Sequence, residues 1–140
     1  MKGWIGVDLD GTLAYYDGWK GEDHIGEPIP RVVEFVKKLI KEGNEVRIFT
    51  ARASLTGRTI ERRQQNVASI KAWCLVYIGQ ELDVTSDKDF GMIALYDDRA
   101  IPVDENEGTL TIDRLRSALR KALGEANELW HETHPESMGR

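Results

Sequence analysis

Two aspartates stand one residue apart at the end of an apolar run, in the stretch Ile5-Gly6-Val7-Asp8-Leu9-Asp10-Gly11-Thr12. Side chains two residues apart on an extended segment leave the backbone on the same side, so Asp8 and Asp10 are expected to face one small volume. Carboxylates this close repel each other unless a cation lies between them or one carries a proton. Hard cations such as Mg²⁺ prefer these oxygens, usually with phosphate as a further ligand. A carboxylate can also attack phosphorus to give an aspartyl-phosphate.

Other residues that could take part in chemistry lie at or just after the ends of the later strands that the sequence predicts. In chain order they are Thr50, Lys88 and the adjacent pair Asp97-Asp98. Taken singly, a threonine that ends a strand is usually a packing or turn residue, and a lone lysine is usually a solvated charge. The adjacent acids are more informative, because two carboxylates at the end of a buried strand need compensation. Ligands of parallel α/β sheets collect at these carboxyl ends.

The order and spacing of these residues resemble the four motifs of the haloacid dehalogenase (HAD) superfamily, most of whose members are Mg²⁺-dependent phosphohydrolases. The resemblance covers nearly the whole chain, and its first motif is Asp8-Leu9-Asp10-Gly11-Thr12. It implies that Asp8 is the nucleophile and that Asp10 is the general acid and then the general base. It also implies that Thr50 donates a hydrogen bond to the transferring phosphoryl group and that Lys88 neutralises the nucleophile and the phosphate.

The same resemblance implies a Mg²⁺ site built from aspartates. Asp8, the backbone carbonyl of Asp10 and Asp98 would hold the cation, and Asp97 would act through water or through Lys88. All four aspartates are therefore candidate metal-site residues. The expected activity is a phosphomonoester hydrolase that works through an aspartyl-phosphate intermediate.

The candidate substrate contacts are Thr50, Ala51 and Arg52. Arg52 lies two residues beyond Thr50, so we expect its guanidinium near the mouth of the site, where it can grip a second phosphate or a carboxylate of the substrate. The irregular stretch Thr12–Pro30 carries the aromatic residues Tyr15, Tyr16 and Trp19. These aromatic residues either form a flap over the site or pack the loop onto the body of the protein.

Strands and helices are expected to alternate along the chain. The expected strands cover residues 4–9, 45–49, 82–85, 91–96 and, more briefly, 101–103, and the expected helices cover 30–42, 59–77 and 110–130. Alternation of this kind predicts an α/β fold with a Rossmann-like parallel sheet flanked by helices, and the resemblance makes it HAD-like. The gaps between motifs are too short for a cap domain. We therefore expect a single domain over 1–130 without a cap, followed by a polar tail over 131–140.

The apolar stripes of two expected helices predict which side chains are buried. For the helix over 59–77 the expected inward residues are Ile60, Val67, Ile70, Cys74 and Tyr77. For the helix over 110–130 they are Ile112, Leu115, Leu119 and Leu123, with Trp130 as a further candidate. Cys74 falls on such a stripe, so it is interpreted as a small core residue and not as a nucleophile.

Composition limits the classes of partner. With a formal net charge of -5, a dedicated nucleic-acid binder is not favoured, although local patches leave nucleic acid open. The single cysteine rules out an internal disulfide and suits a reducing compartment. There is no apolar run of membrane-spanning length and no signal-peptide pattern. We expect a cytoplasmic protein that does not bind membranes, with a small or macromolecular phosphorylated substrate and with homo-oligomerisation left open.

Three other interpretations remain at the level of sequence. The first acids can form a strand-to-turn junction without chemistry. The chain can be a non-enzymatic phosphoryl-accepting module, as in receiver domains, but those place the acid pair early and the acceptor in the middle. It can also be a phosphate-binding module of HAD-like fold. Among enzymes, a phosphatase acting on polynucleotide ends is the alternative to one acting on small molecules.

Overall fold

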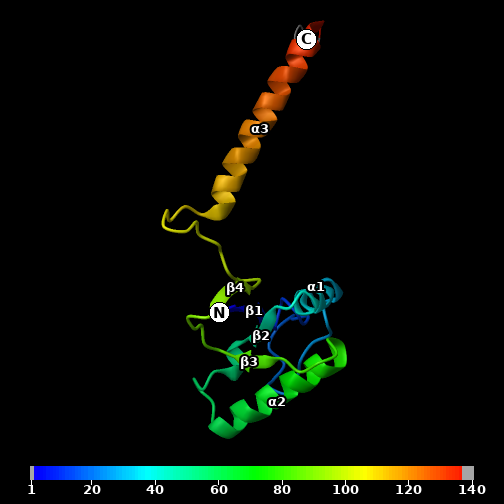
Figure 1. The fold of residues 1–140 in the computed structure, drawn as a ribbon, viewed down its shortest axis with the longest axis vertical. Coiled ribbons are helices and arrows are strands. Elements are labelled where there is room, and N and C mark those ends of the chain that lie inside the picture. Colours follow the sequence, from blue (N-terminus) through cyan, green and yellow to red (C-terminus); the bar gives the residue numbers. More distant parts are fainter. Residues whose placement is uncertain (1, 137–140) are drawn as a thin grey trace. The chain divides into compact units, whose positions relative to one another are not determined.

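A sheet of four parallel strands organises the first part of the chain in the computed structural model, which describes residues 2–136. In chain order the strands are β1 (Trp4–Asp8), β2 (Glu45–Phe49), β3 (Asp83–Thr85) and β4 (Met92–Tyr96). They lie in the order β3-β2-β1-β4, and neighbouring strands are parallel (Figure 1). The predicted α/β fold with a Rossmann-like parallel sheet is confirmed.

The chain divides into two compact units, Met1–Asp98 and Arg99–Arg140. The first contains the sheet, helices α1 (Pro30–Lys41) and α2 (Ile60–Tyr77), and the short 3₁₀ helix η1 (Ala51–Ala53). The second contains helix α3 (Thr111–Thr133). The sequence predicted one domain over 1–130 with a polar tail from 131. Helix α3 continues past residue 130, and residues 137–140 of the expected tail lie outside the described part of the chain.

Both helices of the first unit pack on one face of the sheet (Figure 1). Ile5 and Val7 alternate with Trp4, Gly6 and Asp8 along β1, and they lie opposite Val46 and Ile48 of β2. Because alternate side chains of a strand share a face, these four form one apolar surface. The helix residues buried with them are Val33, Val36 and Leu39 from α1 and Ile70, Trp73 and Cys74 from α2.

Helix α2 differs in part from its predicted stripe. Ile70 and Cys74 are buried as expected, but Ile60 is exposed at the start of the helix. Trp73 and Asn66 are buried instead. Asn66 is inward because its amide bonds the loop and the backbone at η1, a tertiary role that hydrophobic periodicity cannot register.

The other face of the sheet carries the connection from β3 to β4, residues 86–91, on the side opposite α1 and α2 (Figure 1). This connection packs over Trp4, whose indole Nε1 donates a hydrogen bond of 2.7 Å to Asp89. Arg47 covers the same indole, with its guanidinium carbon 4.5 Å from the ring centroid. A right-handed crossover between β3 and β4 requires this face.

The length of the connection explains why it contains no helix. From Thr85, which pairs with Phe49, to Met92, which pairs with Trp4, the chain must return along the strands and cross three strand spacings. That distance is about 20 Å at ~3.3 Å per residue and ~4.8 Å per strand. Residues 86–91 reach at most about 24 Å when extended. At ~1.5 Å per residue a helix would fall far short.

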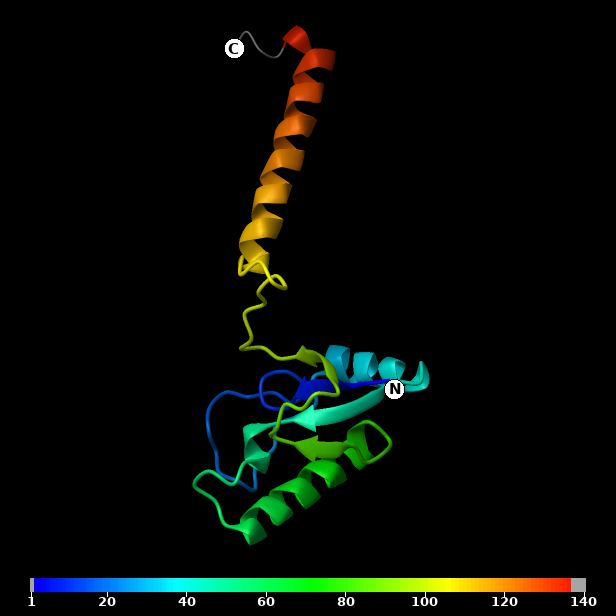
Figure 2. The ribbon, with the colours of Figure 1, turned by 60° about the vertical axis from the view of Figure 1, so that its left-hand side comes forward.

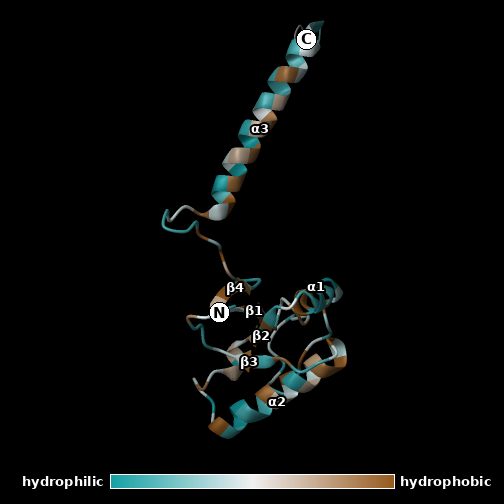
Figure 3. Ribbon diagram, in the orientation of Figure 1, coloured by the Kyte–Doolittle hydropathy of each residue, from teal (hydrophilic) through white to brown (hydrophobic). Residues whose placement is uncertain are grey.

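Helix α3 is amphipathic, with alternating hydrophobic and hydrophilic bands along its length (Figure 3). The sequence predicted that its apolar stripe is buried. Within Thr111–Thr133, all of which the structure describes, no side chain is buried. The physical reason lies in the second unit itself, where α3 is the one helix and no strand is present among the described residues 99–136. The strand expected over 101–103 is reduced to an isolated bridge between Val103 and Leu110.

Among residues 2–136, no helix is long and apolar enough to cross a membrane.

Candidate functional site

The strand order reverses between β1 and β4, since β1 is followed by β2 on one side and β4 lies on the other. The carboxyl ends of β1, β2 and β3 lie at one edge of the sheet (Figure 2). In open parallel sheets, ligands bind outside these ends at the point of reversal. Asp8 ends β1, and Asp97 and Asp98 directly follow β4. The sheet therefore brings the first and last acidic signals of the sequence to one place.

Asp8, Asp97 and Asp98 form an acidic cluster, whose ligand oxygens all lie within 4.8 Å of one another. Carboxylate oxygens at this separation are the donor set that hard divalent cations take. The carboxylate of Asp10 is not part of this cluster. The predicted contribution of Asp10 to the metal site was its backbone carbonyl, and no contact in the structure tests it.

Thr12 links two members of the acidic cluster and was not singled out by sequence reasoning. Its hydroxyl lies 3.2 Å from Oδ2 of Asp8 and 3.0 Å from Oδ1 of Asp98, and it accepts a hydrogen bond of 3.0 Å from the Asp98 backbone N–H. The sequence feature that could have indicated Thr12 is its position two residues after Asp10, where the chain turns back. Thr12 thereby orients two carboxylates that would otherwise rotate apart.

Gly11 makes this turn possible. Its φ of +90 lies in the region that favours glycine, and a Cβ at this position would lie 2.7 Å from Oδ2 of Asp98. The first strand and the end of β4 can therefore approach closely only because position 11 has no side chain.

Burial and the neighbouring acids together raise the pKa of Asp8 to about 7. Burial is the largest cause, followed by the hydrogen bond with Asp98 and the negative charge of Asp97, while the Thr12 hydroxyl acts in the opposite direction. Burial and like charge both disfavour a carboxylate. A divalent cation at this position would compensate the negative charges. The carboxylate oxygens and the raised pKa of Asp8 are therefore both consistent with a site for a hard metal ion.

Asp10 is neutralised by a different partner from the one that the sequence indicated. Its two carboxylate oxygens accept hydrogen bonds from Nε and NH2 of Arg52, at 2.8 and 2.9 Å. The sequence predicted that Asp8 and Asp10 face one volume, with a cation between them or a proton on one of them. The structure instead gives Asp10 a bidentate guanidinium, the arrangement in which arginine binds carboxylates most strongly.

Arg52 is 4% exposed, whereas the sequence placed its guanidinium at the mouth of the site. Besides Asp10, it donates to the backbone carbonyls of Glu22 (3.2 Å) and His24 (2.7 Å) in the 12–30 loop. A buried guanidinium must be paired in this way, because an uncompensated buried charge is costly. Gripping a substrate would require Arg52 to leave Asp10.

Thr50 lies at the end of β2, as predicted, and is 3% exposed. Its side-chain oxygen accepts a hydrogen bond from the backbone N–H of Arg52 (3.2 Å) and so caps η1. The hydroxyl proton of Thr50 is not used by this cap. Ala51 begins η1 and is exposed, next to Thr50.

Lys88 lies on the exposed connection between β3 and β4. Among residues 2–136 it forms no ion pair within 4.0 Å, and its charge is not among the causes that shift the pKa of Asp8. The structure therefore brings Asp8, Asp97 and Asp98 together and leaves Lys88 outside that group. Residues 86–91 belong to neither a helix nor a strand, so no regular element directs Lys88 toward Asp8.

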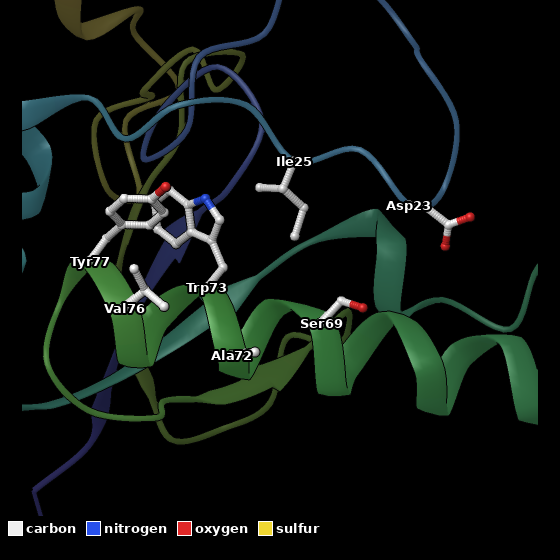
Figure 4. Close-up of a pocket in the computed structure, with 7 residues that line it drawn as sticks. All are labelled: Asp23, Ile25, Ser69, Ala72, Trp73, Val76 and Tyr77. Carbon is white, nitrogen blue, oxygen red and sulfur yellow. The ribbon is translucent and has the colours of Figure 1, made fainter.

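A groove of about 340 Å³ lies between the loop and the outer side of α2 (Figure 4). Its lining residues are Asp23, Ile25, Ser69, Ala72, Trp73, Val76 and Tyr77. Trp73 and Tyr77 pack against each other with ring centroids 4.8 Å apart, and the Trp73 indole donates to the Gly26 carbonyl. None of the predicted site residues lines this groove. It is therefore a separate feature of the surface.

No protein-family model matches the chain, and no curated protein matches it. One solved structure that resembles it is the conserved protein coded by a locus from Bacteroides thetaiotaomicron, with 22% sequence identity and a TM-score of 0.48. The similarity covers 72% of this chain and 79% of that protein. The chemistry of the site therefore rests on its own residues.

Proposed function

We propose that the chain is a Mg²⁺-dependent phosphohydrolase of the HAD type, without a cap domain, that hydrolyses phosphomonoesters through an aspartyl-phosphate on Asp8. The observation that carries the proposal is the acidic cluster of Asp8, Asp97 and Asp98 at the point where the strand order reverses. A purely structural junction gains nothing from three clustered carboxylates, one of whose pKa is raised by burial and by its acidic neighbours.

In this proposal Asp8 and Asp98 hold the cation, with Asp97 beside them. Mg²⁺ bound there supplies positive charge to the equatorial oxygens of the phosphoryl group. Both Asp8 and Asp98 are oriented by the Thr12 hydroxyl. Thr12 is thus proposed to set the separation of the two acids before the cation arrives.

The protein's own groups carry the chemical steps. An Asp8 oxygen attacks phosphorus, and the bond from phosphorus to the leaving oxygen breaks. The Thr50 hydroxyl, whose proton is not used by the η1 cap, donates to a phosphoryl oxygen. Asp10 in its carboxylic acid form gives its proton to the leaving alcohol. The carboxylate so formed takes a proton from the water that attacks phosphorus and breaks the bond from phosphorus to Asp8. Lys88 is proposed to add positive charge when a phosphate is bound, although it stands apart from Asp8 here.

The substrate is proposed to be a phosphomonoester, either a small molecule or the end of a macromolecule. The 12–30 loop lacks helices and strands among its described residues, so it does not form a folded cap. A phosphatase acting on polynucleotide ends stays the less favoured version, because the arginines near the site are paired with loop groups. Arg58 and Arg62 bind Glu22 and Asp23.

The proposal is tested by turnover of p-nitrophenyl phosphate with Mg²⁺. Asp8→Asn removes the nucleophile and one metal ligand with little change in volume, so turnover should fall at least a thousandfold, and EDTA should abolish turnover of the parent protein. The matched control is Asp83→Asn, the same substitution on an exposed residue at the start of β3. Turnover of Asp8→Asn within tenfold of the parent, with the control unchanged, would contradict the proposal.

A further inference from the structure

The guanidinium of Arg52 joins two parts of the chain that are far apart in sequence. On one side it binds both carboxylate oxygens of Asp10, just after β1. On the other it donates to the backbone carbonyls of Glu22 and His24, near the tip of the 12–30 loop. One buried side chain thus connects the loop directly to the carboxylate that is proposed to transfer protons.

The backbone of Arg52 is also held in place by hydrogen bonds. Its backbone N–H donates to the Thr50 hydroxyl oxygen, and its backbone carbonyl accepts from Nδ2 of Asn66 (3.1 Å). Its guanidinium carbon lies 4.9 Å from the centroid of the Trp19 ring. Trp19 belongs to the loop and is 54% exposed. Arg52 therefore cannot follow Asp10 or the loop without breaking contacts to the other.

A second group of contacts holds the loop without reaching Asp10. Nε of Arg58 binds the Glu22 carboxylate at 2.8 Å, Asn66 also donates to Glu22, and Arg62 binds Asp23 at 2.7 Å. Because of these contacts, the loop can be loosened by mutation without removing the arginine that binds Asp10. Loss of Arg58 removes contacts to Glu22 of the loop and to the backbone carbonyls of Ala51 and Ser54, but it leaves the contact between Arg52 and Asp10 in place. Loss of Arg52 removes the contacts to the loop and to Asp10 together.

We infer that Arg52 is a positioning residue that couples closure of the 12–30 loop to the placement of the Asp10 carboxylate. With the loop closed, Arg52 is held by the Glu22 and His24 carbonyls, and its fork fixes both oxygens of Asp10. When the loop opens, Arg52 loses these acceptors and Asp10 loses its fixed orientation. This inference rests on the proposed function, in which Asp10 protonates the leaving group.

Leaving-group dependence separates a positioning role from a general loss of structure. Departure of an alkoxide needs a proton, but p-nitrophenolate departs without one, so misplacement of Asp10 affects alkyl phosphates most. Arg52→Ala should lower kcat/KM, which reports the steps up to departure of the leaving group, at least tenfold more for glycerol phosphate than for p-nitrophenyl phosphate. Arg52→Lys, which keeps the charge without the fork, should show the same split to a smaller degree. Arg58→Ala leaves the contact between Arg52 and Asp10 in place but opens the loop more often, so it should show the same split to a smaller degree than Arg52→Ala.

The coupling also predicts that a change at Asp10 affects opening of the loop. This effect can be measured without an enzyme assay. Lys20 lies on the loop, and its cleavage by trypsin reports how often the loop opens. Asp10→Asn leaves every loop contact of Glu22 and His24 chemically intact, yet it removes the charge that holds Arg52. Cleavage after Lys20 should therefore be at least threefold faster in Asp10→Asn than in the parent, as it should be in Arg52→Ala and Arg58→Ala.

Two results would overturn the inference. One is an equal loss of kcat/KM on both substrates in Arg52→Ala and Arg52→Lys. The other is unchanged cleavage after Lys20 in Asp10→Asn. Failure of the proposed function shows itself differently, as absence of turnover in the parent or activity in Asp8→Asn. In that case the trypsin measurement still decides whether Asp10 and the loop are coupled through Arg52.

Discussion

At the scale of single residues, the four aspartates of the site have two different environments. Asp10 receives a buried guanidinium, whereas Asp8 shares the acidic cluster with Asp97 and Asp98. Spacing in the sequence placed the acids correctly at strand ends. It did not identify Arg52 as the partner of Asp10, because nothing in a linear pattern states which cation folds against which anion.

The raised pKa of Asp8 makes a prediction about stability without metal. The folded protein holds the Asp8 proton up to about pH 7, whereas an unfolded aspartate loses it near pH 3.8. The folded state therefore binds more protons between these values, and ionisation of Asp8 lowers the free energy of unfolding as the pH rises through that window. In EDTA, Asp8→Asn should exceed the parent in stability at pH 8 by about 1–4 kcal/mol.

Thermal or urea unfolding in EDTA at pH 8 and pH 4 checks this. The advantage of Asp8→Asn should shrink toward zero at pH 4, where the parent's Asp8 is protonated in the folded state and is close to its unfolded pKa. With saturating Mg²⁺ at pH 8 the order should reverse, since only the parent has the full donor set. An advantage of Asp8→Asn that is the same at both pH values would mean that charge in the cluster is not its cause.

At the scale of elements, hydrophobic periodicity predicted α1, α2 and the four strands to within a few residues, because each is defined by a local pattern of burial. The connection over residues 86–91 could not be predicted in the same way. Its extended course, and with it the place of Lys88, depends on the distance between β3 and β4, which only the strand order determines. Thr12 was overlooked for a similar reason, since its partner Asp98 is remote in sequence.

The turn after β1 gives a prediction at this scale. Gly11→Ala should destabilise the protein and abolish stabilisation by Mg²⁺, because the new methyl group meets the Asp98 carboxylate and the backbone φ is +90. The matched control is Gly43→Ala, where φ is +89 and the nearest atom, Nζ of Lys2, lies 3.9 Å away. The control should lose about 1–2 kcal/mol from backbone strain and keep its response to Mg²⁺.

Melting curves of both variants with and without Mg²⁺ make the comparison. An undiminished Mg²⁺ response in Gly11→Ala would show that the acidic cluster does not depend on the close approach of the turn to Asp98.

At the scale of the whole molecule, the proposed catalytic residues all belong to the unit Met1–Asp98, and the chain continues in a second unit built on α3. The sequence predicted one domain because the chain is short and the gaps between its motifs leave no room for a cap. It also predicted that the apolar stripe of α3 is buried. Such a pattern shows that Leu115 and Leu119 lie on one side of a helix, but it does not show what covers them. The fold class was predictable from alternation of strands and helices, and the division into units was not.

The central claim is that Asp8 carries the phosphoryl group during turnover, and mass spectrometry of the acid-quenched protein tests it most directly. The protein is mixed with p-nitrophenyl phosphate and Mg²⁺, quenched within one turnover and digested. We predict phosphate on the peptide that contains Asp8, absent when EDTA is added first and absent in Asp8→Asn. Release of p-nitrophenol with no phosphate on Asp8 at any time of quench, or with phosphate on another residue, would contradict the account.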